Sequence, residues 1–562
     1  MILNGSQIFV ECLKELKVDT VFGYPGGAVL NLYDALYKEQ KSIKHIKTSH
    51  EQGAAHAADG YARSTGKVGV CIATSGPGAT NLVTGIATAY MDSVPIVAFT
   101  GQVGTALLGK DSFQEIDITG ITSPITKHNY IVKDVTKLAD IIREAFAIAK
   151  EGRPGPVLID ICKDVTAAEC EFEHKDINDD FYIKHHKGIV HEQVSETVVE
   201  QAATLINNAK QPFIMAGGGV SIAKAHELLA QLARKARIPV TLTLMGLGAF
   251  PSTDPLYTGL IGMHGHKTSN LAVNQCDVLI VLGARFSDRV TSNQSTFAKQ
   301  AKIIHIDVDP AEINKNVATD ISIIGYMDDI LKRLISKIEK KEETPWLKKV
   351  QMWKVKYPLA YIEDGFVKPQ AVIKSFYKHT NGDAFVITEV GQNQMWAAQW
   401  YKYKFPRQYI SSGGLGTMGY GFGAAIGAKV GNPDKVVINF AGDGSFRMNL
   451  NELFTVVSYK IPIIIAILNN SALGMVKQWQ DLFYDKRFSE TVLDQEVDYA
   501  KIAQAFGAKG IKVEKPEDVE KAVIEALNTT DGPVIIDFKV SPTEMVYPIV
   551  PPGAAVDKLI TE

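Results

Sequence analysis

Residues 436–470 constrain the fold more than any other stretch, because two short apolar runs flank one segment with helical periodicity. The run 436–441 is short and rich in β-branched residues, as in a buried strand, and 461–468 has the same character. Between them, 449–459 has apolar residues at helical spacing. A strand–helix–strand unit of this kind predicts a parallel sheet, where ligands bind beyond the carboxyl ends of the strands.

Polar residues follow both predicted strands. Asp443 lies in a Gly-Asp-Gly turn after the first strand, and Asn470 ends an Asn pair after the second. Both turns belong to the same sheet edge, so these two side chains are expected to meet. A carboxylate and an amide oxygen suit Mg²⁺, which commonly holds a diphosphate, and a helix starting near Ser445 would offer N–H groups to the phosphates. An aspartate that only caps a helix explains the first turn by itself, but the Asn pair favours the metal site.

Composition limits the class of protein. The 562 residues suffice for three or four domains, and a net charge of −3 with dispersed Lys and Arg shows no nucleic-acid footprint. The apolar runs are strand-length, so no membrane span is expected. The five cysteines form no CxxC pair, which argues against zinc or a disulfide framework and fits a reducing compartment. The N-terminus enters a helical pattern at 6–16 without a leader, so we expect a cytoplasmic protein.

Alternating strands and amphipathic helices predict an α/β protein with three doubly wound parallel-sheet domains. We expect a first domain at 1–168, a central Rossmann-like domain at 190–338 and a last domain at 367–562. The charged, unpatterned residues 169–188 are expected to form a surface linker, and 337–349 a second connector.

In the first domain, three loops at 25–27, 50–55 and 74–81 follow predicted strands and would line one sheet edge. Glu51 opens an Ala-rich helix, where an acid favourable to the helix dipole is the simplest explanation. His50 and His56 are too far apart for a zinc-protease helix. The long polar loop within 94–130 is of a length that is usually functional.

The central domain has nucleotide-binding features. A glycine run, 217–219, precedes a helix and suits phosphate approach, and Asp307 ends a strand where it would accept from a ribose hydroxyl. A structural Rossmann-like spacer without ligand is an equal alternative.

The last domain carries a GxGxxG match at Gly414, Gly416 and Gly419, which small residues packing a helix explain better than dinucleotide binding. Met418 is either part of the hydrophobic core or an apolar side chain that supports a bent cofactor. Trp479 and Phe483 share a helical face, as a buried aromatic pair or a substrate-pocket wall. The proline-rich tail 546–562 forbids a continued helix and would be disordered or fold over the site as a lid.

With these motifs in place, the chain resembles the large catalytic subunit of acetohydroxyacid synthase (acetolactate synthase), a thiamine diphosphate (ThDP) enzyme. The similarity runs nearly end to end. It rests on VFGYPGG, SHEQGAAHAADGYAR, TSGPGATN, DSFQE, GRPGPVLID, GMHG, GARFSDRV, GGLGTMGYG, GDGSFRMN and GMVKQWQ. GMHG and GARFSDRV favour the FAD-containing biosynthetic type over the flavin-free catabolic one.

The resemblance implies roles at matching positions. Glu51 would activate the cofactor's aminopyrimidine ring, whose nitrogen takes the proton from thiazolium C2. Met418 would impose the V-shaped cofactor conformation, Trp479 would shape the acceptor pocket, and Arg289 would meet an acceptor carboxylate. Gln114 and Lys127 would approach the substrate. The implied Mg²⁺ ligands are Asp443, Asn470 and the carbonyl of Ala472. The other implied ThDP positions are Gly391, Gln392, Asn393, Gly416, Gly444, Ser445 and Met475. The implied FAD positions are Arg153, Gly217, Gly218, Gly219, Met263, His264, Gly265, Gly283, Ala284, Arg285, Asp288, Arg289, Asp307 and Val308.

The implied reaction decarboxylates pyruvate and joins the two-carbon unit to pyruvate or 2-ketobutyrate, giving 2-acetolactate or 2-aceto-2-hydroxybutyrate in branched-chain amino acid biosynthesis. It involves no net redox change, so the flavin would be structural. The family further implies a homodimer or tetramer with shared active sites and a small regulatory subunit.

Alternatives are another enzyme on the same scaffold or a non-catalytic binding protein. Glyoxylate carboligase has Val where this chain has Glu51, and GMVKQWQ with the FAD-loop motifs disfavours pyruvate oxidase. A non-catalytic protein would have lost a cofactor residue, and none is lost. The chain departs from the family pattern at Gly104, Tyr326, Asn393 and Arg447, where Pro, Asp, His and Gln are usual.

Overall fold

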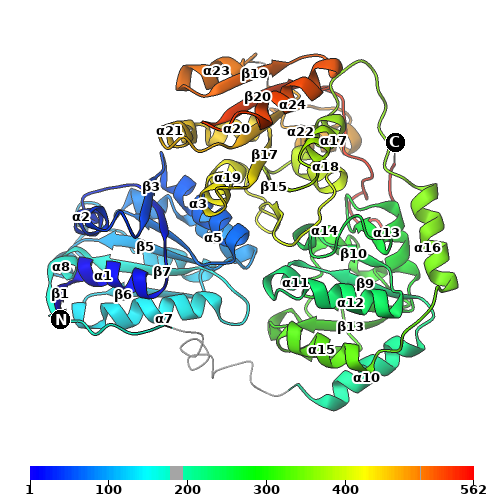
Figure 1. Ribbon diagram of the computed structural model, residues 1–562, viewed down its shortest axis with the longest axis horizontal. Coiled ribbons are helices and arrows are strands. Elements are labelled where there is room, and N and C mark those ends of the chain that lie inside the picture. The colour runs from blue at the N-terminus through cyan, green and yellow to red at the C-terminus, as the bar shows by residue number, and fades with distance from the viewer. Residues whose placement is uncertain (178–193, 494, 562) are drawn as a thin grey trace.

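The computed structural model describes residues 1–177, 194–493 and 495–561, so most of the predicted linker 169–188 lies outside the described residues. Three six-stranded sheets, each parallel throughout, confirm the predicted fold class. Helices cover the sheets, and the three units lie in chain order from blue to red in Figure 1. Continuous β-branched runs form these strands because both faces of each sheet are buried.

The first sheet has the strand order β3-β2-β4-β5-β7-β6. Its strands are β2 (Thr20–Gly23), β3 (Lys44–Lys47), β4 (Gly69–Ala73), β5 (Ile96–Gln102), β6 (His128–Val132) and β7 (Val157–Cys162). Its helices are α1 (Gly5–Glu15), α2 (Leu30–Lys38), α3 (Glu51–Thr65), α4 (Pro77–Thr80), α5 (Val83–Met91), α6 (Ile118–Thr122), α7 (Leu138–Lys150) and α8 (Lys163–Ala167). Beyond the sheet, β1 (Ile2–Asn4) pairs antiparallel with β8 (Glu169–Glu171), so the start of the predicted linker is a strand.

The central sheet has the order β11-β10-β9-β12-β13-β14, in which the winding direction reverses between β9 and β12. Its strands are β9 (Pro212–Ala216), β10 (Val240–Leu242), β11 (Tyr257–Leu260), β12 (Val278–Leu282), β13 (Lys302–Asp307) and β14 (Ile321–Ile324). Its helices are α10 (Glu196–Asn208), α11 (Gly218–Ile222), α12 (His226–Ala236), α13 (Lys267–Gln275), α14 (Asp288–Thr291) and α15 (Met327–Lys337). The expected connector at 337–349 instead leads into α16 (Pro345–Lys356), which Thr344 caps and whose Trp346 is buried.

The third sheet has the order β16-β15-β17-β18-β20-β19. Its strands are β15 (Ala384–Thr388), β16 (Tyr409–Ile410), β17 (Val436–Gly442), β18 (Ile464–Asn469), β19 (Lys509–Val513) and β20 (Val534–Lys539). Its helices are α17 (Pro369–His379), α18 (Gln392–Trp400), α19 (Tyr420–Gly431), α20 (Asp443–Met448), α21 (Leu453–Ser458), α22 (Gly474–Phe483), α23 (Tyr499–Phe506) and α24 (Val519–Leu527). The helix after β17 therefore begins at Asp443 itself rather than near Ser445.

Helices α3 and α19 join the first and last domains at the centre of Figure 1. The two helices approach closely because glycines of each helix lie against the backbone of the other. A Cβ added to Gly427 would lie 1.8 Å from the Ala57 oxygen, and one added to Gly60 would lie 2.1 Å from the Ala424 oxygen. These packing glycines belong to α3 and α19 themselves, whereas Gly414, Gly416 and Gly419 of the GxGxxG match precede α19.

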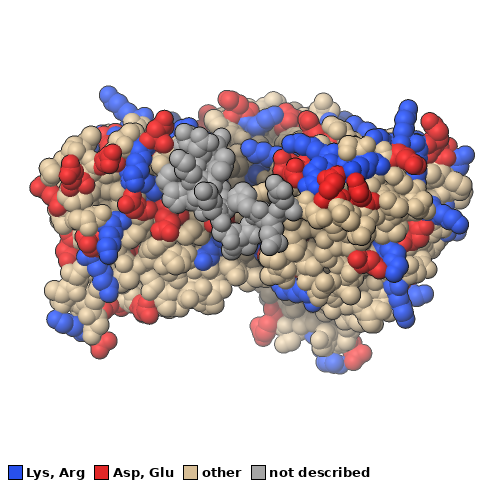
Figure 2. Space-filling view, turned by 90° about the horizontal axis from the view of Figure 1, so that it is seen from below, with Lys and Arg blue, Asp and Glu red and all other residues tan. Residues whose placement is uncertain are grey.

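The C-terminal segment packs onto the central domain, and its backbone bonds include Val550 N–H to the Met263 oxygen at 2.8 Å. No helix of the described ranges is both long and apolar enough to cross a membrane. Acidic and basic side chains are interspersed on the face seen in Figure 2, in keeping with the small net charge.

Candidate active site

Asp443 and Asn470 meet at the carboxyl edge of the third sheet, as predicted. β17 and β18 are paired in register up to Gly442 and Leu468, and each residue follows its strand directly. Asp443 is 1% exposed, and within the described chain neither carboxylate oxygen has a hydrogen-bond partner. Burial raises the pKa of Asp443 to about 6. A buried carboxylate with both oxygens free is the group that a divalent cation would stabilise.

Polar groups from α18 lie beside the residues at the ends of these two strands. Gln392, the first residue of α18, accepts a hydrogen bond from the Asn470 amide at 3.0 Å. The neighbouring Asn393 is buried, its Oδ1 has no partner in the described residues, and its Nδ2 would lie 3.3 Å from a Cβ on Gly442. The helix starts of α18 and α20 therefore lie side by side, and both would present N–H groups to an anion.

The remaining predicted ThDP positions line the same edge. Gly391 has φ of 132°, which suits glycine, and Ser445 donates to the Gly442 oxygen at 3.1 Å. A Cβ on Gly444 would lie 2.5 Å from Leu473. Ala472 is buried and forms an isolated bridge with Val492, and Met475 is half-buried on α22. The structure therefore brings the predicted metal and diphosphate residues together.

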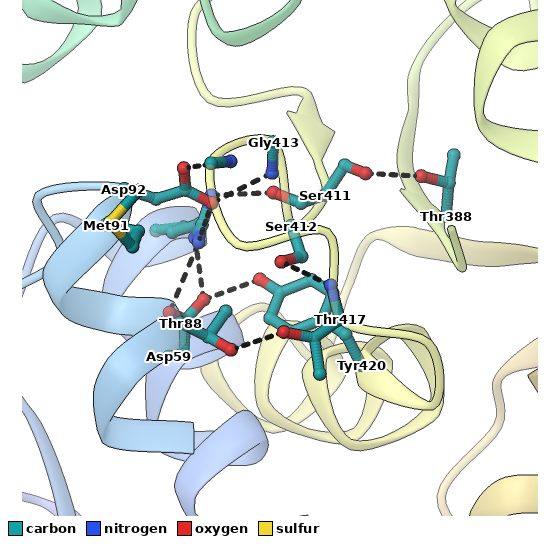
Figure 3. A network of polar contacts seen from close by, with 12 residues as sticks. Asp59, Thr88, Met91, Asp92, Thr388, Ser411, Ser412, Gly413, Thr417 and Tyr420 are labelled. Atoms are coloured by element: carbon teal, nitrogen blue, oxygen red, sulfur yellow. Dashed lines mark hydrogen bonds and ion pairs between the residues drawn. The ribbon is translucent and has the colours of Figure 1, made fainter. Parts of the chain in front are cut away.

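Met418 lies in the loop that leads into α19, and the first domain of the same chain holds this loop (Figure 3). Asp92 accepts from the N–H groups of Gly413 and Gly414 at 2.9 and 2.7 Å, and Thr88 contacts Thr417 at 2.7 Å. Arg63 ties Asp92 to α3 through an ion pair at 3.0 Å.

A buried carboxylate, which sequence reasoning missed, completes the support of this loop. Glu389 is fully buried and accepts from Gly419 N–H at 2.8 Å and Phe422 N–H at 3.0 Å. Burial raises its pKa to about 7. Its place directly after β15, in the sequence TEVGQN, is the signal that would have found it.

Glu51 belongs to a different group of residues, at the carboxyl edge of the first sheet. His50 caps α3 through Gln52 N–H, and the Glu51 carboxylate accepts from Asn81 at 2.9 Å. A Cβ on Gly76 would lie 3.0 Å from the Gln114 Cα, so Gln114 borders the same group. Asn81 was missed from the sequence although it ends the TSGPGATN motif. In the described chain, no hydrogen bond or ion pair joins Glu51 to Asp443 or Met418.

Lys127 does not join Gln114 within one chain. It precedes the amino end of β6, at the edge of the sheet opposite to Glu51, and its ammonium donates to the Ile148 carbonyl at 2.6 Å. Burial lowers the pKa of Lys127 to about 8. The approach of Lys127 to substrate, which the family resemblance implies, stays a prediction.

The predicted flavin residues gather at the carboxyl edge of the central sheet. Gly217, Gly218 and Gly219 follow β9, while Met263, His264 and Gly265 follow β11. Gly283, Ala284 and Arg285 follow β12, Asp288 and Arg289 begin α14, and Asp307 and Val308 lie at the end of β13. The glycines are required by packing, because Gly219 N–H bonds the Gly283 oxygen at 3.1 Å and a Cβ on Gly217 would lie 2.2 Å from that oxygen.

Charged groups from two domains converge on this edge. Arg153, from the first domain, pairs with Asp309 at 3.1 Å and Glu312 at 2.8 Å. Arg285 donates to the Met91 carbonyl at 2.6 Å, and burial together with Arg153 lowers its pKa. Burial raises the pKa of Asp307 to about 6. An anionic ligand at this edge would offset the positive charges of Arg153 and Arg285.

Trp479 and Arg289 meet between the last and central domains. The Arg289 guanidinium carbon lies 6.0 Å from the Trp479 ring centroid, and the Trp479 and Phe483 rings are 5.6 Å apart in an edge-to-face contact. Both Trp479 and Phe483 are partly exposed, so they form a wall rather than a buried pair.

Comparison with known proteins places this geometry in a family. Residues 3–121, 199–334 and 389–538 match the N-terminal TPP binding domain, the central domain and the C-terminal TPP binding domain of thiamine pyrophosphate enzymes. The chain is 46% identical to the probable acetolactate synthase large subunit of Methanocaldococcus jannaschii, with 99% of this chain and 95% of the relative covered. The chain belongs to the acetolactate synthase large-subunit family.

Other members are equally similar. The acetolactate synthase large subunit of Cyanidium caldarium is 46% identical over all of this chain and 97% of the relative. That of Lactococcus lactis is 45% identical, with 99% of this chain and 96% of the relative covered. Membership in the acetolactate synthase family makes the chain a ThDP-dependent enzyme, which confirms the predicted family and cofactor.

Proposed function

We propose that the chain decarboxylates pyruvate and joins the remaining two-carbon unit to a second 2-keto acid, pyruvate or 2-ketobutyrate, as a step of branched-chain amino acid biosynthesis. The single observation that carries the proposal is the Asp443–Asn470 cluster, a buried unpaired carboxylate beside two helix starts. The products would be 2-acetolactate and 2-aceto-2-hydroxybutyrate. The named relatives support the acetolactate reaction.

Asp443, Asn470 and the Ala472 carbonyl would hold Mg²⁺, and the N–H groups of α18 and α20 would bind the diphosphate. ThDP supplies a thiazolium carbon that adds to the keto carbon and stores the electrons released with CO₂. Glu51 would hold a proton on the aminopyrimidine, with Asn81 fixing the direction of its carboxyl group. Met418 would give the cofactor its bend, and the Trp479 wall with Arg289 would receive the acceptor's side chain and carboxylate.

FAD would bind at the carboxyl edge of the central sheet, where Arg153 and Arg285 would meet its phosphates and Asp307 would accept from a ribose hydroxyl. The carboligation transfers no net electrons, so the flavin would support the structure rather than react. Tyr326, which replaces the usual Asp, is 40% exposed at the start of α15, beside the bond from Gly325 N–H to the Asp307 oxygen.

A second copy of the chain would complete the site. Glu51 is held within the first domain and Asp443 within the last, and large apolar side chains stand exposed in both domains: Phe113 is 88%, Phe454 62% and Met448 56% exposed. A homodimer or tetramer in which Glu51 of one chain meets Asp443 of another would bury these groups. The relatives' designation as large subunits supports a small regulatory partner.

The test is incubation of the purified chain with pyruvate, ThDP, Mg²⁺ and FAD, with CO₂, acetolactate and oxygen measured together. We expect one acetolactate per two pyruvate consumed and no oxygen uptake. Oxygen-dependent acetyl phosphate or acetate without acetolactate would instead assign the pyruvate oxidase reaction. Addition of 2-ketobutyrate should divert product to 2-aceto-2-hydroxybutyrate.

A further inference from the structure

Three buried side-chain amides connect the predicted metal ligand Asn470 to the C-terminal segment. The Asn470 amide nitrogen donates to Gln392 Oε1 at 3.0 Å, and Gln392 Nε2 donates to Gln478 Oε1 at 2.9 Å. Gln478 then makes two bonds to one residue of the segment, with Nε2 to the Val546 oxygen at 3.0 Å and Val546 N–H to Oε1 at 2.9 Å. These side chains are between 2% and 8% exposed.

Backbone groups of the C-terminal segment set the direction of the whole series: Val546 orients Gln478, and the Glu544 oxygen accepts from Gln392 Nε2 at 3.1 Å. A backbone N–H can only donate and a backbone carbonyl can only accept, so the Gln478 amide has one allowed orientation. Its Oε1 then faces Gln392 and requires that residue's NH₂ group. The Gln392 oxygen is left for the Asn470 NH₂ group, which directs the remaining atom of that amide, Oδ1, away from Gln392.

The opposite orientation would be unsuitable for a cation. A flipped Gln392 would present its NH₂ group to Asn470, and the Asn470 amide would then exchange the positions of its NH₂ group and its oxygen. An NH₂ group in place of a ligand oxygen repels Mg²⁺.

The C-terminal segment is also held by the central domain. The Pro548 oxygen contacts His264 at 3.2 Å, and Val550 N–H bonds the Met263 oxygen.

We infer that Gln478 is a positioning residue: together with the Glu544 carbonyl, it passes the direction of the segment's backbone through Gln392 to Asn470, so docking of residues 544–550 and binding of the metal diphosphate are coupled. The inference rests on the proposed function only in taking Mg²⁺ and ThDP as the ligands. Partners that orient metal ligands typically change metal affinity by about 10–100-fold when lost.

The test compares the full-length chain with Gln478→Met, which keeps the side-chain length but removes both the hydrogen-bond donor and the acceptor of the amide. The matched control is Gln504→Met on α23, an exposed glutamine of the same domain whose amide bonds only the Gly510 oxygen. Calorimetric titration with Mg²⁺ at saturating ThDP should give affinity about 10-fold or more weaker for Gln478→Met and unchanged affinity for the control. Thermal melting verifies that each variant is folded.

A second readout follows from reciprocity. Hydrogen exchange at the Val546 and Val550 amides of the unmodified chain should slow on addition of Mg²⁺ and ThDP, and this response should be lost in Gln478→Met. Gln478→Glu keeps the acceptor toward Gln392 and Val546 N–H but sets an oxygen against the Val546 carbonyl, so exchange at Val546 should accelerate and Mg²⁺ affinity should fall together with it, by less than in Gln478→Met. It also keeps the inference testable if Gln478→Met fails to fold.

The outcomes separate the two proposals. If the unmodified chain does not bind Mg²⁺ with ThDP, the proposed function fails. If it binds them and Gln478→Met binds equally tightly, with unchanged exchange at Val546, the coupling is refuted and the proposed function stands.

Discussion

Adding one methyl group at Gly427 tests whether the α3–α19 contact sets the geometry of the site. A Cβ there would lie 1.8 Å from the Ala57 oxygen, whereas non-bonded contact requires about 3.3 Å, so the helices must separate by about 1.5 Å. Overpacking of this kind costs about 1–3 kcal/mol. Helix propensity by itself predicts the opposite sign, a gain of about 1 kcal/mol for Gly→Ala within a helix. The steric cost should prevail, because backbone atoms cannot rotate away.

The functional consequence follows from what the two helices carry. α3 begins at Glu51 and α19 follows the Met418 loop. A displacement of about 1 Å in reacting groups costs about 100-fold in rate, so Gly427→Ala should lower kcat for acetolactate formation by about that factor. Mg²⁺ affinity should change little, since Asp443 and Asn470 follow β17 and β18. The melting temperature should fall by about 5 °C.

Gly532→Ala is the matched control, because a Cβ at that position meets nothing within 4 Å. Colorimetric acetolactate assay, calorimetry with Mg²⁺ and thermal melting complete the comparison. A Gly427→Ala chain with full activity and an unchanged or higher melting temperature would refute the argument that this contact positions Glu51 and Met418.

Three further predictions concern single side chains. Glu51→Gln should slow exchange of the ThDP C2 proton, followed by NMR in deuterium oxide, by about 10²–10⁴-fold while Mg²⁺ affinity is kept; an unchanged exchange rate would remove Glu51 from the proton transfer. Burial raises the pKa of Asp160 from 3.8 to about 7, so the folded chain holds that proton more tightly than the unfolded chain, and stability relative to Asp160→Asn should decrease as pH rises through 4–7. Between pH 5 and 8 the relative free energy of unfolding should shift by about 3 kcal/mol in favour of the variant; denaturant titrations with a pH-independent difference would contradict this. Trp479→Leu should lower the ratio of 2-aceto-2-hydroxybutyrate to acetolactate by about 10-fold in a competition between 2-ketobutyrate and pyruvate; an unchanged ratio would show that the ring does not contact the acceptor's extra methyl group.

The sequence predicted those parts of the site that depend on strand ends. Asp443 and Asn470 were placed together because parallel strands share a carboxyl edge, and the structure has them in adjacent, in-register strands. The same rule gathers the predicted flavin residues after β9, β11, β12 and β13. Lys127 lies before a strand rather than after one, and its approach to substrate stays a prediction.

Contacts made by tertiary packing were not predictable from local pattern. Glu389 and Gln478 act on backbone groups from distant segments, and neither stands out by spacing or composition. The sequence pattern also predicted a connector where α16 lies. The charged residues of this stretch dominated the pattern, although Trp346 is buried and Thr344 caps the helix. Such contacts depend on which surfaces meet, and periodicity within one segment does not encode that.

We propose that one active site is built from two chains. Glu51→Gln and Asp443→Asn chains, each inactive alone, would be mixed in equal amounts, dissociated, reassembled and assayed for acetolactate. Random pairing in a two-fold dimer gives half mixed dimers, each with one intact site, so about a quarter of the unmodified activity should return. A mixture that remains inactive, although mass spectrometry shows that mixed dimers have formed, would contradict the account.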